Sequence, residues 1–438
     1  MKIIISFTLL FNLLSCSHAS RKPLAYSTSS NDFIKVKGTR FSLSQKEYQF
    51  MGTNFWYGAN LGADKKLRPR LVRELDKLAS LGIKNLRVIA GSEGPDSKPY
   101  RMVPSMQVSP GKYNNNVLEG LDFLLDEMRK RGMKAVMVLN NYWNWSGGMG
   151  QYLVWAKARN SIPYPPPHPG GSWSKYQRFV SGFYTNKKAV ALFNKHVEFI
   201  VNRRNSLSQI LYKNDPAIMS WELANEPRGD WNVSGFRTWI HETAKLIKSF
   251  DTNHLVTTGS EGDTPYTSAG TDLVEDHRSE YIDYATIHIW VQNWNIYNPN
   301  NPQSLKRATD YSLSYIKKHE IKAKRLGKPV VLEEFGISRD FNSHEPTSKT
   351  KIRDQFFTSL FQHVSDATKD TQNPLQGVNF WAWGGEGRPT NVNGLWLPGD
   401  DFIGDPPHEH QGWYSVYDKD DSTNKVIKDF ANKINTHK

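Results

Sequence analysis

Hydrophobic and polar positions divide this chain into two kinds of segment. Short runs rich in β-branched and aromatic residues predict eight strands, at 48–52, 85–89, 135–139, 218–223, 255–258, 284–289, 330–334 and 378–383. Longer amphipathic stretches between or after them predict eight helices, at 66–81, 117–131, 189–205, 235–250, 273–279, 304–326, 351–364 and 423–434. Strict alternation of strand and helix implies that the strands are parallel.

Eight strand–helix units predict an α/β fold, a single-domain (β/α)8 TIM barrel, in preference to an open doubly wound sheet. An open sheet usually carries a glycine-rich phosphate loop after its first strand, and none is present. Gly82, Gly132 and Gly327 follow predicted helices, where glycine takes the left-handed cap conformation. The loops after strands three, six and eight are long. Since the loops after the strands build the site of a barrel, we expect the functional face at the carboxyl ends of the strands.

Two glutamates stand at the ends of predicted strands. Glu226 follows the fourth strand in Asn225-Glu226-Pro227, and Glu334 ends the seventh. Both strand ends face the same rim of a barrel, and a pair of carboxylates about 5–5.5 Å apart is what retaining glycoside hydrolysis requires. Glu334 is preferred to Glu333 because only one of two neighbouring strand residues points towards the barrel axis.

Several motifs, placed after different predicted strands, carry a resemblance over residues 33–436. Beside Asn225-Glu226-Pro227 and Glu334-Phe335-Gly336, they are Asn54-Phe55-Trp56-Tyr57-Gly58, Asn85-Leu86-Arg87-Val88, Asn141-Tyr142-Trp143-Asn144-Trp145-Ser146-Gly147-Gly148, Thr258-Gly259-Ser260-Glu261-Gly262, Ile287-His288-Ile289-Trp290 and Phe380-Trp381-Ala382-Trp383. Together they resemble glycoside hydrolase family 5 β-mannanases, which belong to a clan of (β/α)8 retaining glycosidases.

The resemblance implies a role for each matching residue. Glu226 would be the general acid and base, which requires a raised pKa. Glu334 would be the nucleophile and must stay ionised, and Arg87 would keep it so through charge-assisted hydrogen bonds. Asn225 would hold the sugar 2-hydroxyl, and His288 would support the acid/base network.

Aromatic residues offer faces on which sugar rings can stack. Trp381, at the end of the eighth strand, is expected to lie under the sugar that is cleaved, with Trp56 and Trp143 as the next candidates. Glu261, after the fifth strand, is expected to bind a neighbouring sugar. Trp290 stands where many family members have a tyrosine that hydrogen-bonds the nucleophile, so the contact of Trp290 stays open.

These features predict a secreted endo-β-1,4-mannanase that hydrolyses internal bonds of mannan, galactomannan or glucomannan by a retaining double displacement. The alternatives are a glucomannan-active cellulase, an exo-β-mannosidase, or a non-catalytic glycan-binding barrel. We expect no cofactor and no metal, a polysaccharide as the partner, and a monomer. Nucleic acid is not expected, because the net charge of +13 is spread along the chain without an arginine-rich block or a zinc-ligand spacing.

Residues 1–19 have the pattern of a secretory signal peptide, with a lysine, an apolar run and then small residues. That run is too short to span a bilayer, and no longer one follows, so no transmembrane segment is expected. Cleavage after Ala19 would free a secreted catalytic domain, residues 20–438. Alternatively, Leu13-Leu14-Ser15-Cys16 resembles a bacterial lipobox, which would anchor the protein through a lipid on Cys16. Cys16 is the only cysteine, so an intramolecular disulfide is excluded.

Overall fold

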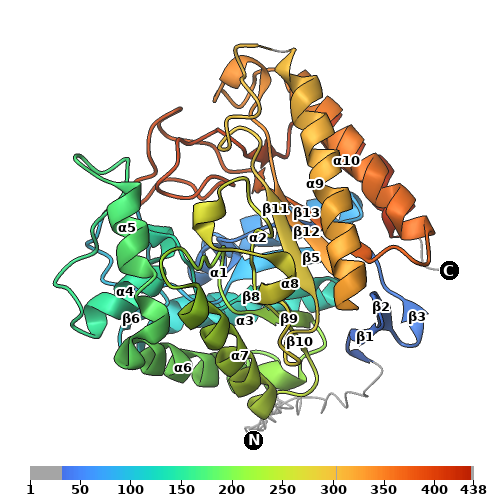
Figure 1. Cartoon of the computed structure of the whole chain (residues 1–438). Coiled ribbons are helices and arrows are strands. Elements are labelled where there is room, and N and C mark those ends of the chain that lie inside the picture. Colours follow the sequence, from blue (N-terminus) through green and yellow to red (C-terminus); the bar gives the residue numbers. More distant parts are fainter. Residues whose placement is uncertain (1–31, 302, 436–438) are drawn as a thin grey trace, which may run out of the picture.

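Eight parallel strands form a ring at the centre of the molecule in the computed structural model, which describes residues 32–301 and 303–435 (Figure 1). The hydrogen-bonded order is β10-β9-β8-β5-β4-β13-β12-β11. Their bounds are β4 (Phe50–Asn54), β5 (Asn85–Ile89), β8 (Lys134–Val138), β9 (Ile218–Glu222), β10 (Leu255–Thr257), β11 (Ala285–Ile289), β12 (Val330–Phe335) and β13 (Leu375–Phe380).

The two outermost strands of this order, β10 and β11, meet and close the ring. The amide of Asp283 donates to the carbonyl of Val256 at 2.8 Å, and the amide of His288 donates to the carbonyl of Glu261 at 3.1 Å. The predicted (β/α)8 barrel is therefore confirmed.

Helices surround the ring (Figure 1). The predicted ones are α2 (Arg68–Ser80), α3 (Asn115–Lys130), α6 (Lys187–Val201), α7 (Val233–Phe250), α8 (Leu273–Asp276), α9 (Ser304–Leu326), α10 (Lys351–Lys369) and α11 (Asp421–Ile434). Gly82, Gly132 and Gly327 have φ of +83°, +65° and +76°, so the predicted left-handed conformation after these helices is confirmed. The first barrel strand begins at Phe50 rather than at Tyr48, because the amide of Tyr48 pairs with Phe41 of a preceding hairpin.

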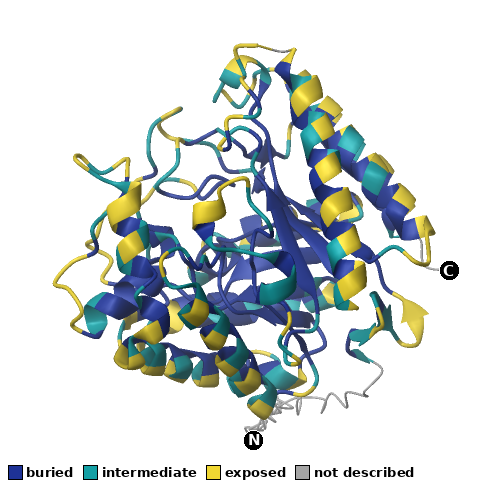
Figure 2. Cartoon of the chain, in the orientation of Figure 1, coloured by how far each residue is buried: buried dark blue, intermediate teal, exposed yellow. Residues whose placement is uncertain are grey.

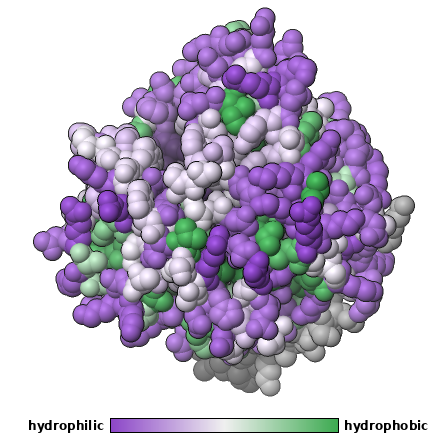
Figure 3. Space-filling view, viewed as in Figure 1, coloured by the Kyte–Doolittle hydropathy of each residue, from purple (hydrophilic) through white to green (hydrophobic). Residues whose placement is uncertain are grey.

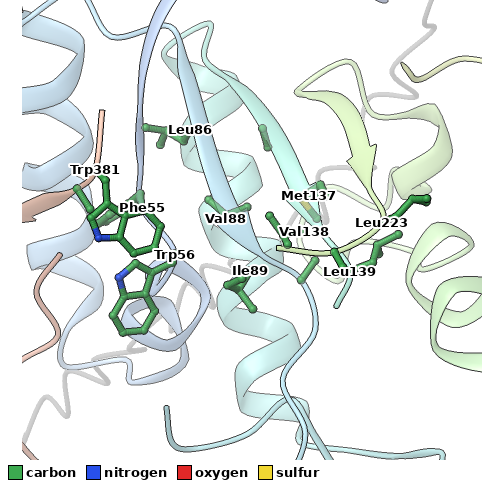
Figure 4. Packing of buried hydrophobic residues seen from close by; sticks show 14 of the residues in the cluster. Phe55, Trp56, Leu86, Val88, Ile89, Met137, Val138, Leu139, Leu223 and Trp381 are labelled. Carbon is green, nitrogen blue, oxygen red and sulfur yellow. The ribbon is translucent and has the colours of Figure 1, made fainter. Parts of the chain in front are cut away.

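The barrel strands are buried on both faces, as is typical of parallel sheets (Figure 2). Leu86 and Val88 of β5 belong to the apolar layer between the ring and its helices (Figure 4). The alternate residues, Asn85 and Arg87, point into the ring, where polar partners meet them. Alternation along the strand thus separates the packing residues from those that build the site.

A small antiparallel sheet closes the amino-terminal end of the barrel. It consists of β1 (Lys35–Lys37), β2 (Arg40–Leu43) and β3 (Lys46–Glu47), and the sequence analysis did not predict it. Phe41 of β2 is fully buried and packs edge-on against Tyr284 at 5.3 Å between ring centroids. It belongs to a cluster with residues from the beginnings of the strands, including Phe50, Leu255 and Val331. This cluster seals the end opposite the predicted site.

Further unpredicted elements lie outside the eight repeating units. They are α1 (Gly58–Ala63), α4 (Gly148–Trp155), α5 (Trp173–Val180), the hairpin of β6 (Gln107–Ser109) and β7 (Lys112–Tyr113), and the pair β14 (Trp383–Gly385) and β15 (Val416–Tyr417). Among the described residues, no helix is both long and apolar enough to cross a membrane. The predicted signal peptide, with Cys16, lies outside the described residues.

Candidate active site

Glu226 and Glu334 meet at the carboxyl ends of β9 and β12. One oxygen of each carboxylate and one nitrogen of His288 all lie within 4.8 Å of one another. Glu226 is 7% exposed and Glu334 2% exposed. We call these two glutamates the carboxylate pair. Two acids that are 108 positions apart along the chain therefore share one buried site on the expected rim.

The backbone around Glu226 is strained. Its amide donates to the carbonyl of Gly259 at 3.0 Å, which extends β9 along its neighbour, but its φ is +49°, in the region that glycine favours. Holding a non-glycine residue there costs about 1–3 kcal/mol, which the surrounding structure must offset. Strain of this kind is concentrated at functional sites.

Arg87 connects the two strands that carry the pair. Its guanidinium makes two hydrogen bonds to Glu222, of 2.8 and 2.5 Å, and one to Asn225 Oδ1, of 2.8 Å. It also donates to Glu334. Arg87 is 3% exposed and Glu222 is fully buried. The five-donor fork of arginine suits a site where several acceptors must be held in fixed positions.

Glu333 and Glu334 both face the barrel interior, so the sequence argument that only one of them does so was wrong. Between Ile287 and His288 the pairing of β11 with β12 shifts by one residue, and Glu333 is the extra residue of a β-bulge. Glu333 Oε2 lies 3.7 Å from Arg87 Nε and 3.6 Å from His288 Nε2. The bulge thus places a further buried acid beside Arg87 and His288, the two residues that also contact Glu334.

Glu226 accepts three hydrogen bonds from ring nitrogens. His288 Nδ1 lies 2.8 Å and Trp290 Nε1 3.0 Å from Oε1, and Trp143 Nε1 lies 2.6 Å from Oε2. His288 Nδ1 is also 3.4 Å from Glu334 Oε2. The question left open for Trp290 is thereby answered, since its N–H is directed to Glu226 and not to Glu334.

The pKa values of the pair lie in the opposite order to the one expected from the sequence. Burial raises the pKa of Glu226, but the hydrogen bond and charge of His288 outweigh burial and bring that pKa to about 2. Burial raises the pKa of Glu334 to about 7, against the opposing charges of His288 and Arg87. Burial lowers the pKa of His288, and the charge of Glu334 and the bond to Glu226 raise it to about 10. The difference arises because His288 lies closer to Glu226 than to Glu334, and Glu334 is the more deeply buried.

The remaining predicted sugar contacts lie in packed surroundings. Trp381 is 4% exposed, and its ring packs edge-on against Trp290. Trp56 is 2% exposed and donates its N–H to the carbonyl of Gly404 at 2.9 Å. Figure 4 shows Trp56 and Trp381 among the buried hydrophobic residues.

Glu261 and Trp143 are both held by Arg228. Glu261 is 1% exposed and binds that guanidinium with both oxygens, at 2.6 and 2.9 Å. The guanidinium also lies over the Trp143 ring, 4.9 Å from its centroid, and Tyr176 stacks parallel to the ring at 6.4 Å. Trp143 directs its N–H to Glu226 at the centre of the site, and its role as a sugar contact stays a prediction.

Sequence reasoning missed Glu222 and the segment that carries His408 and Glu409, and it set Glu333 aside. An acid inside an otherwise apolar buried strand is the signal that would have identified Glu222. Glu409 Oε2 and His408 Nδ1 are buried without a hydrogen-bond partner among the described residues. Burial raises the pKa of Glu409, and the charges of Asp405, Glu226 and Glu334 raise it further.

Glu226, His288 and Glu334 have the atom types and spacing of a metal site. Hydrogen bonds from Trp290, Trp143 and Arg87 already converge on these two carboxylates. The absence of a metal and of a cofactor stays a prediction.

Comparisons with known proteins find mannan-hydrolysing enzymes and a family of mannosidase-like glycoside hydrolases. The family described as "GH family 5 beta-mannosidase-like" matches residues 31–438. The chain is 32% identical over 352 residues to mannan endo-1,4-beta-mannosidase 1 of Solanum lycopersicum, covering 77% of this chain and 80% of that protein. It is 30% identical over 387 residues to mannan endo-1,4-beta-mannosidase 5 of the same plant, covering 84% and 86%.

Solved structures give the same result. The crystal structure of a glycoside hydrolase family 5 mannosidase from Rhizomucor miehei is 39% identical to this chain and superposes with a TM-score of 0.85. The match covers 93% of this chain and 98% of that one.

Proposed function

The chain belongs to glycoside hydrolase family 5 and is a glycoside hydrolase of the mannanase type, and on this premise we propose that it cleaves internal β-1,4-mannosidic bonds of mannan, galactomannan or glucomannan with retention of configuration. The observation that carries the proposal is the buried carboxylate pair, of which one oxygen of Glu226 lies within 4.8 Å of one oxygen of Glu334. Retaining enzymes have carboxyl groups about 5–5.5 Å apart, whereas inverting enzymes keep about 6.5–9.5 Å for a water molecule.

In the first step, the carboxylate of Glu334 attacks the anomeric carbon while Glu226 gives a proton to the glycosidic oxygen. The bond to the leaving sugar breaks, and the remaining sugar forms an ester with Glu334. In the second step, Glu226 takes a proton from water, the water oxygen attacks the same carbon, and Glu334 leaves as a carboxylate. Asn225 is the proposed contact to the sugar 2-hydroxyl, and Trp381 the proposed surface under the cleaved sugar.

His288 supplies the proton that Glu226 requires. In the free enzyme at neutral pH, His288 carries it, because its pKa is raised to about 10 while that of Glu226 is lowered to about 2. The 2.8 Å contact between Nδ1 and Oε1 is short enough for direct transfer. Glu334 ionises above about pH 7. At neutral pH the cluster can therefore hold an ionised nucleophile and one transferable proton at the same time.

Replacing either glutamate tests the assignment of roles. In Glu226→Gln the loss of acid/base catalysis should lower turnover of mannohexaose by about 10²–10⁴-fold. On an aryl β-mannoside with a good leaving group, azide should rescue Glu226→Ala and yield the β-azide, because it attacks the covalent intermediate. Azide should rescue Glu334→Gly with the α-azide, since it then takes the place of the nucleophile. Exchange of these two products between the variants would reverse the roles.

A second candidate is exo cleavage from a chain end. The buried polar atoms of His408 and Glu409 that have no hydrogen-bond partner among the described residues favour it, since a polar segment near enough for the carboxylate charges to act on it can close one end of a groove. The solved mannosidase, whose name does not specify endo action, is 39% identical to this chain, against 30–32% for the relatives named as endo-acting. Product analysis on mannohexaose separates the two, because endo cleavage gives di- to tetrasaccharides first, whereas exo cleavage gives mannose and mannopentaose first.

Secretion and a monomeric state complete the proposal. Mass spectrometry of the mature amino terminus should find Ser20 as the first residue if cleavage follows Ala19, or a lipid on Cys16 if the lipobox is used. Light scattering should give the mass of one chain.

A further inference from the structure

Two exposed tryptophans stand on neighbouring loops at the catalytic end of the barrel. The chain has 14 tryptophans, and Trp173 and Trp231, at 39% and 55% exposure, are the two in the exposed class. Trp173 begins α5 in the loop after β8, and Trp231 lies in the loop after β9, five positions beyond Glu226. Since β8 and β9 are adjacent and parallel, both loops leave the barrel at the same rim.

Trp173 packs against a residue that hydrogen-bonds Glu226. Its ring meets that of Trp143 edge-on at 5.5 Å, and the N–H of Trp143 binds Glu226. Exposure rises along this path, from 7% at Glu226 through the half-buried Trp143 to 39% at Trp173. Trp173 is the most exposed aromatic residue of this path, whereas the guanidinium of Arg228 already lies over the ring of Trp143.

Trp231 is held against the same helix. The guanidinium of Arg178, on α5, lies 6.0 Å from the centroid of its ring. The next residue, Asn232, donates to the carbonyl of Ser181 at 3.0 Å, which ties the loop after β9 to the end of α5. Trp173 and Arg178 are five residues apart on α5, about 7.5 Å along its axis. The two indoles thus stand near opposite ends of a single short helix.

We propose that Trp173 and Trp231 form a platform that binds the sugars on the leaving-group side of the cleaved bond. This inference rests on the proposed function, in which Glu226 protonates the leaving sugar, so that the surface continuous with Glu226 faces that part of the substrate. The occupant is the β-1,4-mannan main chain, whose C–H faces stack on indole rings. The two tryptophans therefore select for substrates long enough to reach beyond α5.

A matched control residue lies elsewhere on the surface. The face in Figure 3 is mostly hydrophilic, with small hydrophobic areas between hydrophilic ones. Exposed hydrophobic residues are normal on protein surfaces. Ile321, on α9, is 55% exposed, like Trp231, and serves as the matched control.

The test compares kcat/KM on mannohexaose with kcat/KM on mannotriose for wild type, Trp173→Ala/Trp231→Ala, Trp173→Phe/Trp231→Phe and Ile321→Ala. We expect the hexaose-to-triose ratio to fall about tenfold in the double alanine variant, because truncation of an anchoring aromatic weakens binding by this order. The phenylalanine variant should recover part of the ratio, and Ile321→Ala should keep it. An unchanged ratio, or an equal loss on both substrates, would overturn the proposal.

Calorimetry of mannohexaose binding separates this inference from the proposed function. If the wild type cleaves neither substrate, the proposed function fails, and the platform is then judged by affinity alone. Weaker binding of mannohexaose by the double alanine variant than by Ile321→Ala supports the platform, and equal binding by the two variants refutes it.

Discussion

Replacing His288 by glutamine removes one positive charge from the centre of the site and leaves a side chain that can still form hydrogen bonds. In the wild type, the imidazolium lies 2.8 Å from Glu226 and 3.4 Å from Glu334. Without the imidazolium, the main influence that lowers the pKa of Glu226 is absent. We expect Glu226 to hold the proton itself in this variant, so that a positive and a negative charge disappear from the surroundings of Glu334 together.

The net effect on Glu334 follows from the two distances. At an effective dielectric constant of about 20, the imidazolium charge at 3.4 Å contributes about 5 kcal/mol, and the Glu226 charge, whose oxygen lies within 4.8 Å, contributes at least about 3.5 kcal/mol. The imidazolium has the larger effect on the pKa of Glu334, and losing both charges disfavours the ionised form of Glu334 by up to about 1.4 kcal/mol. That equals about one pKa unit. The pKa of Glu334 should rise from about 7 towards about 8.

The assay is the pH profile of kcat/KM on a soluble manno-oligosaccharide, which reports the ionisations of the free enzyme. In the wild type, activity should rise through about pH 7 as Glu334 ionises and fall near pH 10 as the proton leaves His288. In His288→Gln the acidic limb should move up by about one unit. The alkaline limb should move down, because a carboxyl group now holds the transferable proton. If both limbs of the His288→Gln profile stay at their wild-type pH, or if the acidic limb moves to lower pH, the reasoning is refuted. His241→Gln on α7 is the control.

Three further predictions concern the site and the closed end of the barrel. Arg87→Lys keeps the charge but leaves acceptors of Glu222 unpaired, so the free energy of unfolding in urea should fall by about 1–3 kcal/mol. An unchanged urea midpoint would contradict this. Trp290→Phe removes a hydrogen bond to ionised Glu226, so kcat/KM should fall by about 10–100-fold; equal values for both proteins would exclude that role. Phe41→Ala should lower the free energy of unfolding in urea by about 3–5 kcal/mol. It should leave kcat unchanged, because Phe41 lies at the end of the barrel opposite the active site. A lower kcat would show that the two ends of the barrel are not independent.

Hydrophobic periodicity predicted the barrel because each of its units is local. A buried strand such as β5 and an amphipathic helix such as α9 are recognisable from consecutive residues, and their predicted bounds agree with the structure. The sheet of β1 to β3 escaped prediction, because its strands are only two to four residues long and are held by Phe41 against residues far along the chain.

By itself, the sequence determined the order of strands and helices and the positions of Arg87, Glu226 and Glu334 at one rim, since strand alternation and parallel connections follow from local pattern. Only the tertiary structure decided how protons are arranged there. The bulge that turns Glu333 inwards and the proximity of His288 to Glu226 depend on register between neighbouring strands. Coulomb energies inside a buried site vary with separations of a few ångströms, and such separations are set by packing among segments that are distant in the sequence.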